Sequence, residues 1–134
     1  MDASLRYVKI IWSAFLFAAL LYIWIPEQVH VQSRELAPAF YYAMIGLAIL
    51  MLPIIMVMRK ATIGLAEPIL RNAPQDASAL MKWRSGQIVT AAMCEAIVLF
   101  GLVLRFVGAT RMQAAPLYAL GIGALIVFWP KSLE

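Results

Sequence analysis

Glu95 is the residue of this sequence whose type and position most suggest chemistry. This single carboxyl group has ten uncharged residues before it, 85–94, and nine after it, 96–104. Ionising an isolated acid at the centre of a bilayer costs on the order of 2.5–3.5 kcal/mol by insertion scales. We therefore expect Glu95 to face another helix rather than open lipid. We also expect it to be protonated at neutral pH and able to donate a hydrogen bond.

Three roles for Glu95 remain open at this stage. It fixes helix packing as a protonated acid, it binds and releases a proton, or it contacts a subunit or cofactor outside this chain. The residues three and four positions away on the same helix carry no charge: Ala91, Ala92, Val98 and Leu99. Its partner must therefore come from another helix, and depth in the membrane favours Ser13 over Tyr41 or Tyr42.

Small residues predict where helices approach each other closely, because they let two backbones come near. We expect this role for two alanines beside the acid and for three glycines of the C-terminal half: Ala91, Ala92, Gly101, Gly121 and Gly123.

The other chemically interesting residues indicate packing or solvent contact. Cys94 is the only cysteine, so it has no partner for an internal disulfide, and we expect it to pack in the core. His30 is the only histidine and lies in a short polar segment with too few neighbouring ligands for a metal. No nucleophile–base pair or phosphate loop is apparent. We expect no enzyme activity, no metal and no cofactor.

The composition indicates a membrane protein. Of the 134 residues, 64% are hydrophobic and 13% are charged, against roughly 45–50% and about 25% in ordinary soluble domains. A spanning helix needs about 20 mostly apolar residues. We predict an all-α, single-domain integral membrane protein over residues 1–134, with a connection at 59–85 and four spans: 8–25, 37–58, 86–107 and 112–129.

Lys and Arg residues set the predicted orientation. Eight lie on one side of the predicted spans and three on the other. The positive-inside rule then places both termini and the 59–85 connection in the cytoplasm, which predicts a multi-pass protein of the inner membrane of a bacterium. Because the charges lie in clusters between apolar runs, they do not form a nucleic-acid footprint. The expected partners are the lipid bilayer and other membrane subunits.

The third helix is predicted to be long and continuous. Its pattern begins near Asp76, continues through Lys82, Trp83 and Arg84, and ends at Gly108, which is suited to a left-handed cap. The helix would then project into the cytoplasm. The segment that follows the second span either extends that span or lies along the membrane surface.

The segment 71–106 resembles the c subunit of rotary ATP synthases, the proteolipid of the ion-driven ring. That family has an Arg-Gln-Pro-type loop and a midmembrane acid in an Ala-x-x-Glu-Ala setting. The matching residues here are Arg71 and Pro74, Ala91 and Ala92, Glu95 and Ala96, and then Phe100, Gly101, Leu102 and Val103. The resemblance covers about residues 42–106 and implies that Glu95 carries an ion. The glycine run of the family's first hairpin helix is reduced here to Gly46, so a four-helix bacterial membrane family resembling the c subunit is the other reading.

Two functions follow from these observations. The first is a non-catalytic small subunit of a larger, energy-converting membrane complex, which acts by helix packing and stabilisation. The alternative is a proton-binding, c-type ion-translocating protein that uses Glu95.

Overall fold

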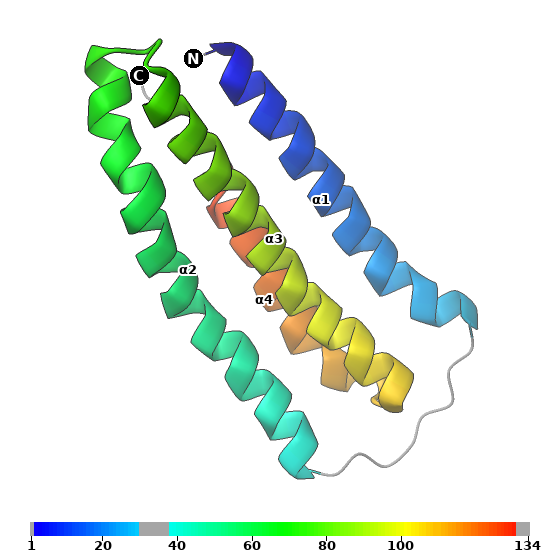
Figure 1. Ribbon diagram of the computed structural model, residues 1–134. Helices are drawn as coiled ribbons and strands as arrows, with labels where there is room; N and C mark the ends of the chain where they lie inside the picture. The colour runs from blue at the N-terminus through cyan, green and yellow to red at the C-terminus, as the bar shows by residue number, and fades with distance from the viewer. Residues whose placement is uncertain (1, 30–37, 131–134) are drawn as a thin grey trace.

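A computed structural model describes residues 2–29 and 38–130 of the chain. These residues form four helices and no strand: α1 (Asp2–Val29), α2 (Pro38–Asn72), α3 (Ala77–Val107) and α4 (Arg111–Val127) (Figure 1). The predicted all-helical, four-helix class is therefore confirmed. α1, α2 and α3 are each long and apolar enough to cross a membrane, whereas α4 is apolar but shorter, with 17 residues.

Three of the helices are longer than the hydrocarbon core of a bilayer, and α2 and α3 exceed it most. At about 1.5 Å per residue, the 35 residues of α2 and the 31 residues of α3 span roughly 52 Å and 46 Å, against a hydrocarbon core of about 30 Å. α2 continues through Pro53 and Pro68, so the segment after the second span extends that helix. The 59–85 connection accordingly consists of the last turns of α2, a turn at 73–76 and the first turns of α3.

α3 is the central element of the fold. α1, α2 and α4 all pack against it, whereas α1 and α2 lie on opposite sides of it and make almost no contact with each other (Figure 1). α1 and α3 run in the same direction, and α2 and α4 run in the opposite one. The described helices therefore form an open arrangement around one axis rather than a closed bundle.

α1 packs through a stripe of residues spaced four or seven positions apart. Its fully or nearly fully buried members are Ser4, Val8, Trp12, Ala19 and Pro26. This spacing keeps one face of a helix against its neighbour. The remaining faces of α1 are largely exposed, with Ile10, Phe17 and Trp24 each more than half exposed.

Both ends of α3 are closed by local signals. The Asp76 side chain accepts a hydrogen bond from the Ala79 backbone N–H at 2.9 Å, which satisfies one free donor of the first turn. Gly108 has φ 124°, and its N–H and that of Ala109 donate to the carbonyls of Arg105 and Leu104, which is a Schellman arrangement. The prediction of one continuous helix that ends at Gly108 is confirmed. α4 then begins with a capping box between Thr110 and Gln113.

The small residues singled out from the sequence fall into two groups. Ala91, Gly101 and Gly121 are buried, and a Cβ added at Gly101 would lie 2.7 Å from Tyr118 Cε1 of α4. Ala92 and Gly123 do not pack tightly among the described residues: Ala92 is exposed, and a Cβ at Gly123 would meet no atom within 4 Å. Each lies away from the α3–α4 interface on its own helix, and a packing role for these two against another chain stays a prediction.

Gly121 and Gly123 form a matched pair for testing the α3–α4 interface. A Cβ at Gly121 would contact the Val98 side chain and lie 3.0 Å from the Cys94 carbonyl oxygen and the Val98 backbone nitrogen. Since backbone cannot move aside cheaply, Gly121→Ala should destabilise the protein by about 1–3 kcal/mol. Gly123→Ala should be neutral or slightly stabilising. Reversible unfolding in mixed micelles measures both, and equal effects would contradict this packing.

Candidate functional site

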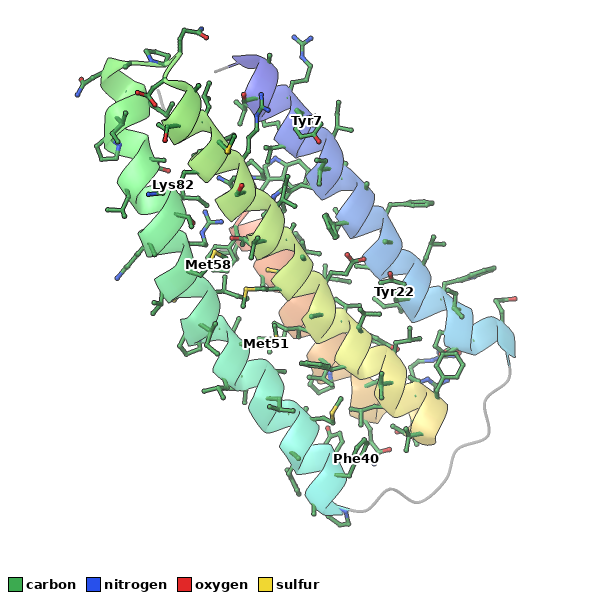
Figure 2. The ribbon with its side chains drawn as sticks, in the orientation of Figure 1. Tyr7, Tyr22, Phe40, Met51, Met58 and Lys82 are labelled. Atoms are coloured by element: carbon green, nitrogen blue, oxygen red, sulfur yellow. The ribbon has the colours of Figure 1, made fainter. Side chains whose placement is uncertain are left out.

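The Glu95 carboxyl lies at the interface between α3 and α1. Its residue is only 7% exposed, although it stands in the middle of an apolar helix. On α1, the phenol of Tyr22 lies near this carboxyl, and Figure 2 shows Tyr22 on the side of α1 that faces α3. The prediction that Glu95 faces another helix agrees with this position.

The register between α1 and α3 explains why Tyr22 is the residue opposite Glu95. Near the start of α1, the Arg84 guanidinium donates to Ser4 Oγ at 2.8 and 3.0 Å. Further along, the Trp12 indole donates to the Gln87 backbone carbonyl at 3.2 Å. Because the two helices are parallel, these contacts place the last third of α1 beside the middle of α3.

The predicted hydrogen-bond partner of Glu95 was wrong. Ser13 is exposed, and its hydroxyl donates to the Lys9 carbonyl of its own helix at 2.8 Å. Ser13 follows Trp12 and so lies about 100° around α1 from the buried stripe. Tyr41 and Tyr42 pack edge to face against each other on α2, on the far side of α3. Ala19 and Pro26 are seven positions apart and both belong to the buried stripe of α1. Tyr22 lies three positions after Ala19, so the same helical spacing places it on the face that meets α3.

The Glu95 carboxyl carries an unsatisfied oxygen. Its Oε1 is buried and has no hydrogen-bond partner among the described residues. A protonated carboxyl offers one O–H donor and retains acceptor capacity, and the nearby phenol of Tyr22 is the polar group of α1 placed to pair with it. The described residues contain no group of three or more His, Cys, Asp or Glu side chains that could hold a metal ion. His30 lies outside the described residues. The arrangement suits proton binding or helix pairing rather than metal chemistry.

Cys94 lies on a different face of α3 from Glu95. It is fully buried, and its backbone carbonyl is close to Gly121 of α4. The two neighbouring residues in sequence therefore serve two interfaces, with Glu95 towards α1 and Cys94 towards α4.

A polar layer connects all four helices about two turns from Glu95. It is built around Gln87 of α3, whose carbonyl accepts from Trp12 of α1 and whose Oε1 accepts from Arg59 of α2 at 3.5 Å. The residues that end α4 complete it: Trp129 packs edge to face on Trp12, with ring centroids 6.2 Å apart, and Phe128 lies under the Arg59 guanidinium.

An ion cluster connects α1 with the α3–α4 corner at the opposite end. Arg105 donates to Glu27 at 3.2 Å and to the Ala109 backbone carbonyl at 2.9 Å, and Arg111 donates to both oxygens of Glu27. The Arg105 side chain is 10% exposed and the Arg111 side chain 74%. Exposed ion pairs contribute little to stability, so Arg105 is the cation that positions the end of α1.

Comparison of the chain with protein-family models, with curated proteins and with solved structures gives no match. The interpretation of the site therefore depends on its geometry.

A double-mutant cycle between Tyr22 and Glu95 tests the site. Tyr22→Phe removes only the hydroxyl, and Glu95→Leu removes the carboxyl, so each variant removes the interaction that the cycle measures. We expect a coupling free energy of roughly 0.6 kcal/mol, with an upper range near 1.7, as found for interhelical hydrogen bonds in membranes. The cycle of Ser13→Ala with Glu95→Leu should give none. Coupling to Ser13 instead of Tyr22, measured by unfolding in mixed micelles, would contradict the register of α1.

Proposed function

We propose that this chain is a non-catalytic subunit of a larger membrane complex and acts by packing its helices against partner helices. The supporting observation is the face of α3 between α1 and α2, which no other helix of the described chain covers. The exposed residues along this face are Ser85, Val89, Ala92, Leu99 and Val103.

This face has a composition that suits contact with another helix. α1 and α2 lie on either side of it, and small residues such as Ser85 and Ala92 let a partner backbone approach closely. α1 and α2 also bury little of themselves among the described residues: 17% and 11% of their most apolar stretches, against 50% for α3. The described helices thus offer one face of α3 and two broad lipid-facing or partner-facing surfaces.

Native assembly in a mild detergent tests this proposal. We expect the wild-type protein to migrate with partner chains. Ala92→Phe adds bulk to this face of α3 and should release the protein from the complex without unfolding it, since Ala92 is exposed in the isolated chain. Val57→Phe adds similar bulk on the outer face of α2, where Val57 is 67% exposed, and should assemble normally. Migration of the wild type only as a lone small species would contradict the proposal.

The proposed orientation places both termini and the α2–α3 turn in the cytoplasm of a bacterial cell. The support is the gathering of basic residues at the end of the molecule that carries the start of α1 and the α2–α3 turn: Arg6, Lys9, Arg59, Lys60, Arg71, Lys82 and Arg84. Cytoplasmic segments of inner-membrane proteins carry this excess.

Cysteine accessibility tests this orientation. In a Cys94→Ala background, Asn72→Cys should react with a membrane-impermeant thiol reagent only after the membrane is opened. Met112→Cys, at the other end and 81% exposed, should react in intact cells. The reverse pattern would overturn the orientation.

Proton binding by Glu95 is the second candidate function, and the resemblance to the c subunit implies it. The observation that favours it is the buried carboxyl with one unpartnered oxygen beside Tyr22. Carbodiimides modify protonated carboxyls held in apolar surroundings, so under this hypothesis Glu95 should react near neutral pH and Glu95→Gln should not. Glu67→Gln should leave the reaction unchanged. Absence of Glu95 labelling under conditions that label a ring proteolipid would rule the candidate out.

A further inference from the structure

Arg59 is a cation whose hydrogen-bonding capacity is largely unused within the described residues. Its guanidinium has five N–H donors and makes one long hydrogen bond, at 3.5 Å, to a neutral amide oxygen of Gln87. No carboxylate of the described ranges forms an ion pair with it, and Glu67, two turns further along α2, influences it only at a distance.

The Arg59 side chain is nevertheless held in a defined place. It is partly buried, and its guanidinium carbon lies 4.8 Å from the centroid of the Phe128 ring, within the range of a cation–π contact. The Gln87 amide fixes its other side. An arginine whose guanidinium is simply hydrated extends along the surface with its charged end in solvent. The Arg59 side chain is instead directed across the end of α4.

The Arg59 guanidinium lies beside the end of α4 and is not enclosed by helix packing there. α2 makes almost no contact with α4, and Arg59 itself stays partly exposed. Arg59 also lies at the level of the membrane boundary, because Arg59 and Lys60 are the first charged residues after the apolar run of α2. Trp12 and Trp129 lie at the same level along the helices. Tryptophans concentrate at this boundary.

We propose that Arg59 binds the phosphate of an anionic phospholipid beside α2 and the end of α4. A planar guanidinium makes two parallel hydrogen bonds to phosphate oxygens. Phe128 orients the guanidinium from below, while the acyl chains of the lipid lie along the exposed apolar surface of α2. The excess of basic residues at this end of the molecule attracts an anionic headgroup rather than a zwitterionic one.

The test compares lipids added to the intact protein in a neutral detergent. Phosphatidylglycerol should raise the thermal unfolding midpoint by several degrees, because a ligand bound only by the folded state stabilises it. Phosphatidylcholine should do so much less, and inorganic phosphate at equal concentration should have no effect. An equal shift with inorganic phosphate would overturn the lipid assignment.

Matched variants locate the effect. Arg59→Gln should abolish the phosphatidylglycerol-dependent shift. Lys60→Gln removes the same charge from the next, exposed residue and should retain the shift. Loss of the shift in both variants, or in neither, would overturn a specific site at Arg59.

Arg59→Lys keeps the charge but loses the paired donors, and it covers the case in which Arg59→Gln does not fold. Native mass spectrometry should then show several-fold less bound phosphatidylglycerol on Arg59→Lys than on the wild type. Equal occupancy would overturn the proposal.

Discussion

The hydrogen bond from the Trp12 indole to the Gln87 carbonyl is the interaction on which the arrangement of helices depends. It fixes α1 beside α3, and the side chain of the same glutamine receives Arg59 from α2. At the end of α4, Trp129 packs against Trp12 and Phe128 packs against Arg59, the two residues that donate to Gln87. Gln87 of the central helix therefore sets the axial positions of α1, α2 and α4 against α3. The contacts further along α3 follow from this register.

α3 can serve three neighbours because its faces differ in composition. The faces towards α2 and α4 are tight, since Gly86 lies against Thr62 and Ile63, and Val98 lies against Gly121. The face towards α1 carries the polar groups: Arg84 with Ser4, Glu95 with Tyr22 and Arg105 with Glu27. Packing by shape holds two helices, and spaced polar contacts hold the third.

Sequence reasoning was most successful where the signal is local. Apolar length, the helical pattern from Asp76 and the cap at Gly108 predicted the number of helices and the bounds of α3, because these depend on neighbouring residues alone. The partner of Glu95 depends instead on the rotation and axial shift of α1 against α3, and a depth estimate could not distinguish Ser13 from Tyr22. The lack of packing between α1 and α2 was also not visible, because both helices are apolar on all sides.

The central position of α3 has a consequence for the order in which the protein forms during synthesis. α1 and α2 leave the ribosome first, yet they have almost no surface in common. At roughly 5–20 residues per second, about 4–16 s separate the completion of α1 at Val29 from that of α3 at Val107. During this interval Tyr22 and Trp12 have no tertiary partner in the chain. The N-terminal half is therefore an intermediate without its tertiary contacts, and the Trp12 indole and the Tyr22 hydroxyl need water, lipid headgroups or the insertion machinery as partners until α3 is made.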